Sequence, residues 1–584
     1  MMEAHPGVKR SPHCKALLVF PRFAGASFWN YRRTCELLGA KYSAAPLGLI
    51  TLAALLPREW AVRLIDRNVE ELTEEDLAWA DVVMTGGMLP QRNDALELIG
   101  RAHDRGKPVV VGGPDATCAP DVYAAADFRV LGEAEEVIAD FLAAWNQGAR
   151  GGLFEAPRFP DLTRSPVPRF DLLKLDRYLH IGVQFSRGCP FECEFCNVID
   201  LNGRAPRTKT PEQMLLELDA LRQLGYRGHV DFVDDNLIGN RKAVKPFLRE
   251  LAAWLGARGR PFEFTTEASL DLASDPELLD LLKKANFFAV FVGIETPDTA
   301  TLLAANKRQN ARRDVAASVA AIHRAGLFVN AGFIVGFDTE RGSVADAMVA
   351  CIEEAGIPVC MVGLLFALPG TRLTRRLAAE NRLATGEVRY ASDDADQCTS
   401  GLNFVTARPR LEVLADYRDI LARIYAPDAF FARARRVGRE LDRSAHALRP
   451  SVANVLRDLR GFLGCSGAWG SATGACAPNG GGPWSTVLCT TQRRSRSCSR
   501  SQRCTCTSAR IRALSSNAST RRSRRHKRAG TDQLEIDESS GAGRSFPARW
   551  RARRADPPQE IVARLHFLAA ISTARRSTVT AGFR

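Results

Sequence analysis

Two long stretches of the chain alternate short apolar runs with segments whose apolar residues recur at helical spacing. In the first stretch, continuous apolar runs fit buried strands at 15–21, 61–68, 81–87, 108–114 and the start of 128–145. Helical spacing occupies 46–57, 91–106 and the rest of 128–145. Apolar strands between amphipathic helices are typical of a parallel sheet covered on both faces. Residues 15–148 are therefore expected to form a doubly wound, Rossmann-like α/β domain.

The carboxyl ends of these strands are the expected ligand-binding edge of the first domain, because open α/β sheets bind ligands there. The residues at those ends are Pro21–Arg22, Asp66–Asn68, Gly86–Met88, Gly112–Thr117 and Gly132–Glu133. Gly112 and Gly113 let the backbone approach a ligand closely, although turning the chain explains either glycine equally well. The stretch has no G-x-G-x-x-G, so support for a dinucleotide ligand is weak.

The second stretch follows a linker at 149–179, whose residues 156–178 are rich in Pro and Asp. Strands are expected at 180–186, 229–236, 262–269, 288–296, 328–338 and 359–370, with helices such as 211–225 and 312–326 between them. Six strand–helix repeats predict a partial (β/α)6 barrel rather than the full eight. Polar residues stand at the carboxyl ends of these strands, where such barrels gather their chemistry: Asp234, Asp235, Asn236, Glu267, Glu295, Thr296 and Asp338.

Three cysteines follow the first barrel strand in "QFSRGCPFECEFCNV", residues 184–198: Cys189, Cys193 and Cys196. A structural zinc site takes four ligands, usually as two separated pairs. No second C-x-x-C lies nearby, and His180 begins the preceding strand and should lie far away. A [4Fe–4S] cube held by three thiolates keeps one iron open for a substrate or cofactor. One cysteine is usually a small buried residue, but three at a barrel mouth favour a cluster.

Charge is distributed unevenly along the 584 residues, a length that suggests about two to four domains. The net charge is +14, yet residues 465–584 contain 21 Arg and one Lys against six acidic residues. Residues 1–464 contain 58 basic and 60 acidic residues, a net of −2. A nucleic-acid partner would therefore depend on the tail alone, and none is expected for the folded part.

The tail at 465–584 is rich in Ser, Arg, Gly and Cys and lacks apolar periodicity. One interpretation is a disordered basic tail that binds RNA or acidic partners. The interpretation we favour is an out-of-frame translation, and no function is assigned to the tail cysteines. The chain shows no apolar run of membrane-spanning length and no signal peptide, so a cytoplasmic location, where thiols stay reduced, is expected.

The segment "CPFECEFC" resembles the cluster loop of radical S-adenosylmethionine (SAM) enzymes, C-x-x-x-C-x-aromatic-C, with Phe195 as the aromatic residue. The resemblance implies that Cys189, Cys193 and Cys196 hold a [4Fe–4S] cluster, whose open iron is chelated by the amino and carboxylate groups of SAM. It also implies that one electron cleaves SAM to methionine and a 5′-deoxyadenosyl radical. An electron donor such as flavodoxin or ferredoxin is then expected.

The same resemblance implies which residues contact SAM. The backbone at Phe195 lies near the adenine, and Asp234 and Asp235 of "VDDN" occupy the position that contacts the SAM amino group. Glu267 is a polar SAM contact. Further contacts are Gly293, Ile294 and Glu295 of "VGIET" near the ribose, and Gly336 of "GFIVGF" near the adenine. For Asp235 and Glu267, a structural carboxylate that caps a loop or pairs with arginine is an equally good explanation.

The first domain resembles the cobalamin-binding domain that precedes the barrel in one large radical SAM class, through "PLGLITLAALLP", "VVVGGPDAT" and "VLGEAEE". The D-x-H-x-x-G motif is absent, so cobalamin is expected to bind without a histidine ligand. The resemblance implies that the loop at Gly86–Gln91 faces the cobalt. The residues implied to contact cobalamin are Met88, Gly112, Gly113, Thr117, Gly132 and Glu133. The barrel core is expected at 180–390, followed by a helical extension at 391–464 that resembles that of a family subgroup.

The expected function is cobalamin-dependent methylation of an unactivated carbon in a small-molecule substrate, either a lipid such as a hopanoid or a natural product. A radical SAM enzyme that binds cobalamin without transferring methyl, and instead rearranges rings or forms carbon–carbon bonds, is the first alternative. A tRNA methylthiotransferase needs a second cluster, for which Cys14, Cys35 and Cys118 are too scattered. A zinc- or RNA-binding module is the remaining alternative.

Overall fold

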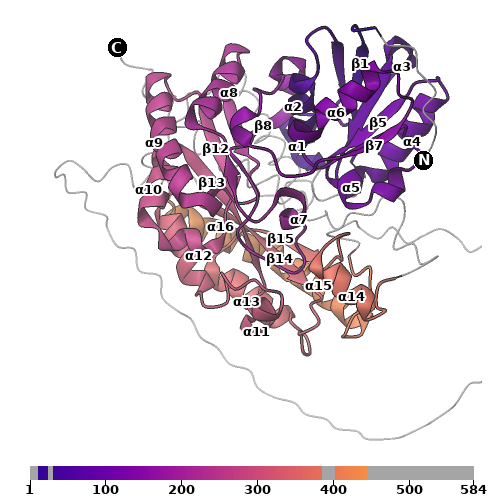
Figure 1. Cartoon of the computed structure of the whole chain (residues 1–584). Coiled ribbons are helices and arrows are strands. Elements are labelled where there is room, and N and C mark those ends of the chain that lie inside the picture. Colours follow the sequence, from indigo (N-terminus) through magenta and orange to yellow (C-terminus); the bar gives the residue numbers. More distant parts are fainter. Residues whose placement is uncertain (1–10, 24–30, 385–400, 443–584) are drawn as a thin grey trace, which may run out of the picture. The chain divides into compact units, whose positions relative to one another are not determined.

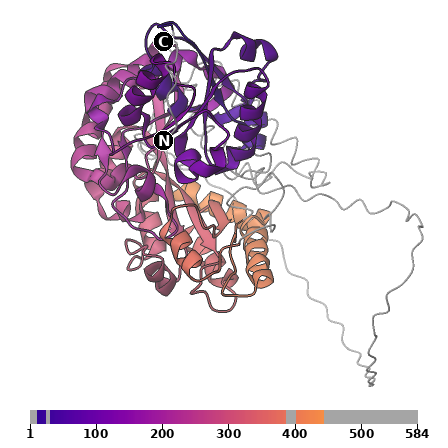
Figure 2. The ribbon, with the colours of Figure 1, turned by 45° about the vertical axis from the view of Figure 1, so that its right-hand side comes forward.

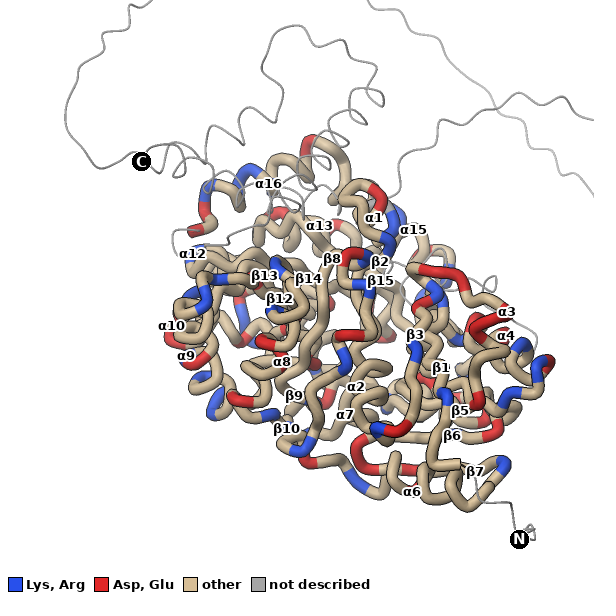
Figure 3. The backbone as a smooth tube through the Cα atoms, turned by 90° about the horizontal axis from the view of Figure 1, so that it is seen from above, with Lys and Arg blue, Asp and Glu red and all other residues tan. Residues whose placement is uncertain are grey.

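The computed structural model describes residues 11–23, 31–384 and 401–442 (Figure 1). The tail predicted at 465–584 and parts of the extension predicted at 391–464 lie outside the described residues. Basic and acidic residues are interspersed along the described chain rather than gathered by sign (Figure 3), in keeping with the near-neutral balance of residues 1–464.

The first block folds as a six-stranded parallel sheet, sheet A, ordered β3-β1-β4-β5-β6-β7. Its strands are β1 Lys15–Phe20, β3 Ala61–Asp66, β4 Val82–Gly86, β5 Val109–Gly112, β6 Phe128–Leu131 and β7 Gly152–Glu155. Its helices are α2 Leu47–Leu55, α3 Glu74–Trp79, α4 Arg92–His103, α5 Gly113–Cys118 and α6 Ala134–Asn146. Along β1, Leu17 and Val19 enter one apolar layer while Ala16 and Leu18 enter the other. Both faces are covered, and the expected doubly wound domain is confirmed.

In the two large sheets, two short strands lie where the sequence predicted none. β7 falls in the predicted linker and pairs with β6. β2, Tyr42–Ala44, follows α1, Arg32–Leu38, and pairs with the first barrel strand, β8, instead of with sheet A. Strands of three and four residues are too short to show a hydrophobic period.

The second block forms a seven-stranded parallel sheet, the barrel sheet, ordered β15-β14-β13-β12-β11-β8-β2. Its further strands are β8 Tyr178–Val183, β11 Gly228–Phe232, β12 Phe262–Glu267, β13 Phe287–Glu295, β14 Phe328–Val335 and β15 Val359–Leu364. Its helices are α8 Pro211–Gln223, α9 Arg241–Ala257, α10 Pro276–Lys284, α11 Thr299–Ala304, α12 Val315–Arg324, α13 Ala345–Ala355 and α14 Arg372–Ala379. Figure 1 shows α9, α10 and α12 along the outer side of the strands, and in Figure 2 the helices follow an arc. The expected partial barrel is confirmed, with β2 as an added edge strand.

Aromatic side chains fill the core between the barrel strands and their helices. Phe185, just after β8, stacks on Phe247 of α9 with ring centroids 4.6 Å apart. Phe232 contacts Phe247, Phe264 and Phe287. Each fully buried aromatic ring of this kind stabilises the fold by about 1.5–3 kcal/mol. The core therefore fixes the point at which the chain leaves β8 for the cysteine loop.

All six predicted barrel strands end earlier than the sequence predicts, and for β11 and β14 the hydrogen bonds show why. β11 stops at Phe232 instead of at 236, because the side chains of Asp234 and Asp235 accept hydrogen bonds from the cysteine loop. β14 stops at Val335 because the next two backbone amides donate to Glu340, not to a neighbouring strand.

The extension packs against the end of the barrel. Its helices are α15 Arg410–Ile424 and α16 Pro427–Glu440, and a proline at the first position of α16 suits a new helix start. The Tyr425 hydroxyl donates to the Cys360 carbonyl at 2.6 Å. Arg408 pairs with Glu340 at 3.0 Å and with Asp416 at 2.7 Å.

Candidate active site

The cysteine loop is closed on itself at the mouth of the barrel. It runs between the two-residue strands β9, Ser186–Arg187, and β10, Arg207–Thr208, which pair antiparallel, and it contains α7, Val198–Asn202. Gly188 has φ +101°, and a β-carbon there would lie 2.8 Å from the Gly203 carbonyl oxygen. The Cys189 amide donates to that same oxygen at 3.2 Å. Only glycine allows this approach, so the first cysteine is placed beside the end of its own loop.

The three thiols lie close enough to influence one another. Burial raises the pKa of Cys196 to about 12, and the neighbouring thiols of Cys193 and Cys189 add to the rise. Burial and Cys193 likewise raise the pKa of Cys189. Within the described residues, no three His, Cys, Asp or Glu side chains surround a single metal ion. A cube spreads three thiolates over three irons, so this donor set fits a [4Fe–4S] cluster better than zinc.

Asp234 and Asp235 hold the start of the cysteine loop. Asp234 is 1% exposed and accepts hydrogen bonds from the Phe185 amide at 3.1 Å and the Ser186 hydroxyl at 2.6 Å. Burial raises the pKa of Asp234 to about 7, although these hydrogen bonds oppose the rise. Asp235 accepts from the Gly188 amide at 2.8 Å and from the Asn202 side chain at 2.9 Å, which joins both ends of the loop. Their predicted role as SAM contacts stays a prediction, because both carboxylates already serve the loop.

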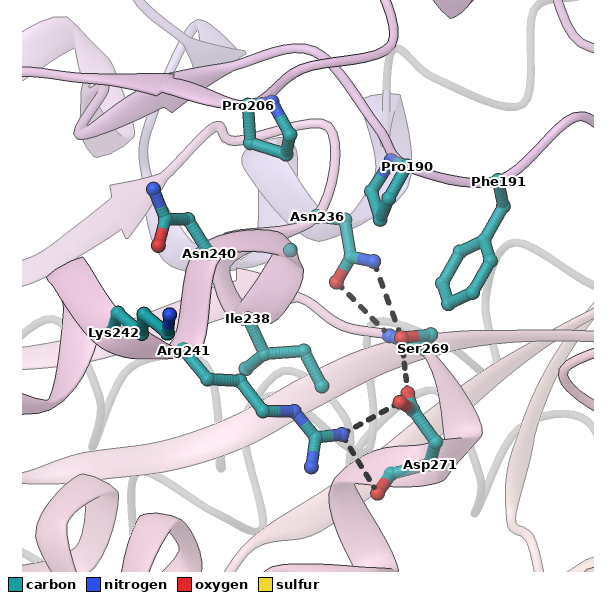
Figure 4. A pocket seen from close by; sticks show the side chains of 11 residues that line it. Pro190, Phe191, Pro206, Asn236, Ile238, Asn240, Arg241, Lys242, Ser269 and Asp271 are labelled. Carbon is teal, nitrogen blue, oxygen red and sulfur yellow. Dashed lines mark hydrogen bonds and ion pairs between the residues drawn. The ribbon is translucent and has the colours of Figure 1, made fainter.

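A pocket of about 390 Å³ adjoins the outer side of the cysteine loop (Figure 4). Pro190 and Phe191, which separate the first two cysteines, form one wall. Asn236 and Ser269, which also line the pocket, exchange hydrogen bonds at 3.1 and 3.3 Å, and Ser269 donates to Asp271. Arg241 donates to Asp271 at 2.6 Å. Polar side chains that line the pocket are therefore paired with one another.

Glu267 lies at the end of β12 among other carboxylates. Burial raises the pKa of Glu267 well above its usual value, and the charges of Asp231, Asp234 and Asp235 raise it further. Asp231 accepts a hydrogen bond from the Thr265 hydroxyl, which lies 2.7 Å from the His229 ring. These surroundings disfavour the ionised form of the Glu267 carboxyl; its contact with SAM stays a prediction.

The "GIE" segment of β13 is shaped around an ion pair. Glu295 is 7% exposed, has φ +70°, and accepts from Lys307 at 2.6 Å. The Glu295 carboxylate and the Lys307 ammonium lie directly over Gly293, so a side chain there would have to displace the ion pair. Asn310 donates to the Gly293 and Ile294 carbonyls at 2.9 and 3.3 Å. A non-glycine residue with positive φ stores backbone strain of the kind found at functional sites.

The segment that follows α11 reaches the cysteine loop, a contact that the sequence did not predict. Lys307 lies 5.9 Å from the centroid of the Phe195 ring, and its pKa is raised by Glu295, Cys193 and Cys196 against the effect of burial. Gln309 donates to the Cys193 sulfur at 3.6 Å, and the Ala305 carbonyl accepts from the Glu194 amide at 2.9 Å. The sequence feature that could have indicated this contact is a lysine and two side-chain amides, Lys307, Gln309 and Asn310, soon after "GIE". Phe195 also packs edge-on against Phe337, the residue after Gly336.

The carboxyl edge of sheet A is built from backbones packed against each other. A β-carbon on Gly86 would lie 2.6 Å from the Gly112 carbonyl oxygen, so the loops after β4 and β5 need glycine to meet. Thr117 accepts a hydrogen bond from the Gly132 amide at 3.0 Å and donates to the Gly113 carbonyl at 2.9 Å. Met88 is 44% exposed on this edge. The edge suits a large, flat ligand, and these residues stay predicted cobalamin contacts.

Asp66, at the end of β3, links the edge of sheet A to the barrel sheet. It accepts from the Tyr178 hydroxyl at 2.9 Å and from the Asn68 side chain at 2.8 Å. Burial raises the pKa of Asp66 to about 6, and these hydrogen bonds oppose the rise. Asn68 also donates to the Pro21 carbonyl, so these strand ends hold one another.

The edge of sheet A meets the cysteine loop directly. Glu133 accepts from Arg187 and from Arg207, both at 2.6 Å. The Asn197 side chain, next to Cys196, lies 3.8 Å from the Cys118 sulfur of α5. Cys118 is therefore placed beside the loop rather than in a second cluster with Cys14 and Cys35, which are buried elsewhere. None of the described helices combines the length and apolar character needed to cross a bilayer.

Comparison with protein families matches three parts of the chain. Residues 183–349 match the radical SAM superfamily, residues 37–142 match the B12 binding domain, and residues 371–470 match a domain of unknown function (DUF4070). A radical SAM barrel preceded by a B12-type sheet defines a radical SAM enzyme with a cobalamin domain.

Relatives share most of this architecture. An uncharacterized methyltransferase from Synechocystis sp. is 46% identical over 421 residues, which are 72% of this chain and 77% of that protein. The hopanoid C-2 methylase of Rhodopseudomonas palustris is 38% identical over 424 residues, 72% of this chain and 78% of that protein. The radical SAM methyltransferase TsrM from Kitasatospora setae, solved with cobalamin and a [4Fe–4S] cluster bound, shares the fold with a TM-score of 0.57 at 16% identity, over 84% of this chain and 100% of that chain.

The chain belongs to the cobalamin-binding radical SAM family. It is a radical SAM methyltransferase, and its cofactors are a [4Fe–4S] cluster, SAM and cobalamin. The resemblance drawn from the cysteine spacing and from the first domain is confirmed.

Proposed function

We propose that this methyltransferase methylates an unactivated carbon of a lipid or natural product, with a hopanoid-type lipid as the first substrate to test. The hopanoid C-2 methylase supports this choice, since the chain covers 78% of it at 38% identity. The observation that carries the proposal is the contact of the three-cysteine loop with the carboxyl edge of the B12-type sheet through Arg187 and Glu133. Methylation of an unpolarised carbon needs a radical and a methyl donor in the same place.

When bound, the cofactors supply the electron that cleaves SAM, a radical that removes hydrogen from the substrate, and a methyl group. The chain's own residues hold the reacting parts in place. Asp234 and Asp235 fix the cysteine loop, and Lys307 places a positive charge beside it. The residues that we propose as SAM contacts are Phe195, Asp234, Asp235, Glu267, Gly293, Ile294, Glu295 and Gly336.

We also propose a one-electron donor protein, such as flavodoxin or ferredoxin, as a partner. Cleavage of SAM consumes one electron, and the cofactors return to their starting state only when an outside donor replaces it. Purified donors added to the reconstituted chain test this: 5′-deoxyadenosine formation must follow the donor concentration.

The substrate proposal is tested by anaerobic turnover. The reconstituted chain is incubated with hydroxocobalamin, a reductant, SAM carrying a labelled methyl group, and a hopanoid. We expect a product heavier by one labelled methyl group, together with 5′-deoxyadenosine and S-adenosylhomocysteine in equal amounts.

The matched control is the Cys196→Ala variant, which must form no 5′-deoxyadenosine. Substrate-dependent 5′-deoxyadenosine without labelled product would favour the non-methylating alternative. Labelled product from a different scaffold, and none from hopanoids, would reject the lipid class and keep the methylation.

A further inference from the structure

Four charged side chains join sheet A to the stem of the cysteine loop. Glu133 precedes α6, and Glu135 lies in the first turn of that helix. Arg187 lies on β9, two residues before Cys189, and Arg207 lies opposite it on β10. We call Glu133, Glu135, Arg187 and Arg207 the latch.

All three guanidinium nitrogens of Arg187 donate hydrogen bonds, two of them to carboxylates of the latch. It donates to Glu133 at 2.6 Å, to Glu135 at 2.8 and 3.1 Å, and to the Gln184 side chain at 2.8 Å. The side chains of Arg187, Glu133 and Glu135 are only 14%, 8% and 7% exposed. Burial alone would raise the pKa of Glu135, but the charge and hydrogen bonds of Arg187 outweigh it and lower that pKa to about 2. Arg187 therefore faces two nearly buried carboxylates.

Arg207 connects the other stem of the loop to the same carboxylate. It donates to Glu133 at 2.6 and 3.2 Å, and to the carbonyls of Pro160 and Asn202 at 2.8 and 2.9 Å. Both strands that flank the cysteine loop are thus bound to Glu133. The latch balances two positive charges with two negative charges.

The barrel holds the opposite side of the same loop. Asp235 binds the Gly188 amide and the Asn202 side chain, so Asn202 is held from both directions. The cysteine loop is therefore clamped between two independent sets of carboxylates, one from each sheet. A shift of sheet A relative to the barrel must move the stem of the loop or break the latch.

We propose that the latch couples the two cofactor sites, so that cobalamin bound at the edge of sheet A stabilises the cluster loop and a loaded cluster loop strengthens cobalamin binding. The two effects must be equal in size, because coupling between binding sites is reciprocal. Glu133 is then a positioning residue and not a cobalamin contact, since both its oxygens are taken by arginines. This inference depends on the cofactors and not on the substrate, so failure of the lipid proposal leaves it standing.

The test measures how fast the reconstituted full chain loses cluster iron to a chelator, with and without saturating hydroxocobalamin. Cobalamin binding and iron content are first confirmed by visible spectra and iron analysis. We expect cobalamin to slow iron loss by about fivefold or more, the lower end of usual coupling factors. In Glu133→Gln, the ratio of the iron-loss rates without and with cobalamin falls to nearly one. The double variant Glu133→Gln/Arg207→Gln keeps the latch neutral, and its protection must fall likewise.

The matched control is Glu136→Gln, which removes the same charge one turn into α6 but breaks only the exposed pair with Arg158. Cobalamin must slow iron loss in this variant as much as it does in the unchanged chain. In a second measurement, the cobalamin dissociation constant of the unchanged chain must be lower with the cluster than without it, because coupling between binding sites is reciprocal. Cobalamin that binds without slowing iron loss, or full protection in Glu133→Gln, would overturn the proposal.

Discussion

The carboxyl edges of sheet A and of the barrel sheet lie at opposite sides of the latch, yet they are built differently. At the edge of sheet A, backbones meet through glycines such as Gly86, and an apolar Met88 is exposed. At the edge of the barrel sheet, buried carboxylates such as Asp234 and Glu267 gather beside three thiols. The closely packed edge of sheet A suits a large, flat ligand. The carboxylates and thiols at the edge of the barrel sheet suit a cluster and a small zwitterionic ligand. The edge of sheet A therefore suits cobalamin, and the edge of the barrel sheet suits the cluster and SAM.

The largest effect at the edge of the barrel sheet is expected from removing one of the three thiols. Cys196→Ala is expected to abolish the cluster and to lower 5′-deoxyadenosine formation by at least about 100-fold, because even an outer partner of a metal ligand is worth about 10–100-fold. Iron analysis and the quantity of 5′-deoxyadenosine check this. Cys118→Ala, which removes the thiol beside Asn197 on the sheet A side, must keep its iron.

Next in size is the pH dependence contributed by Asp66. Because burial raises its folded pKa to about 6, the folded protein favours the protonated carboxyl, and this contribution is lost as pH rises. We expect the free energy of unfolding to fall by about 2–3 kcal/mol between pH 4 and pH 6, relative to Asp66→Asn. Urea unfolding of both proteins across this range measures it. Parallel curves would show that Asp66 contributes no such dependence.

The glycine packing of sheet A is tested by Gly86→Ala. The added β-carbon would lie 2.6 Å from the Gly112 carbonyl oxygen, so we expect a loss of about 1–3 kcal/mol in unfolding free energy and weaker cobalamin binding. Gly100→Ala, in α4 with nothing within 4 Å, is the control and should stabilise the chain by about 0.5–1 kcal/mol. Equal effects of the two changes would contradict the packing argument.

The smallest effect concerns the charge beside the cysteine loop. Lys307→Gln is expected to lower the reduction potential of the cluster by about 50–100 mV, since a nearby positive charge stabilises the reduced form by about 1–2 kcal/mol. Redox titration followed by electron paramagnetic resonance measures this without SAM or substrate. Glu295→Gln/Lys307→Gln removes both charges of the pair and should restore most of the potential. An unchanged reduction potential in Lys307→Gln would show that the charge of Lys307 does not influence the cluster.

What could be predicted from the sequence is local. The cysteines could be found because their spacing lies within eight residues, and all strands of the two sheets except β2 and β7 could be found because each carries its own apolar run. β2 was missed because three residues carry no pattern. Asp234 and Asp235 were located at the mouth of the barrel, but their bonds to the loop, 49 and 47 residues away, were not visible.

The latch and Lys307 show why the rest could not be predicted. Glu133 and Arg187 are 54 residues apart, one beside sheet A and the other on the stem of the cysteine loop, so their pairing depends on how these parts meet. Lys307 reaches the loop from a turn after α11, more than 100 residues after the cysteines, without a motif of its own. Charged residues of this kind look like ordinary surface positions until the fold brings them together.

Spin–spin interaction between the two cofactors tests most directly whether their sites face each other across the latch. The reconstituted chain is reduced so that the cluster is paramagnetic while cobalamin is in its Co(II) form, and electron paramagnetic resonance spectra are recorded with each cofactor alone and with both. The account predicts that the combined spectrum shows splitting or broadening absent from the sum of the separate spectra. A combined spectrum equal to that sum, with both cofactors fully bound, would contradict it.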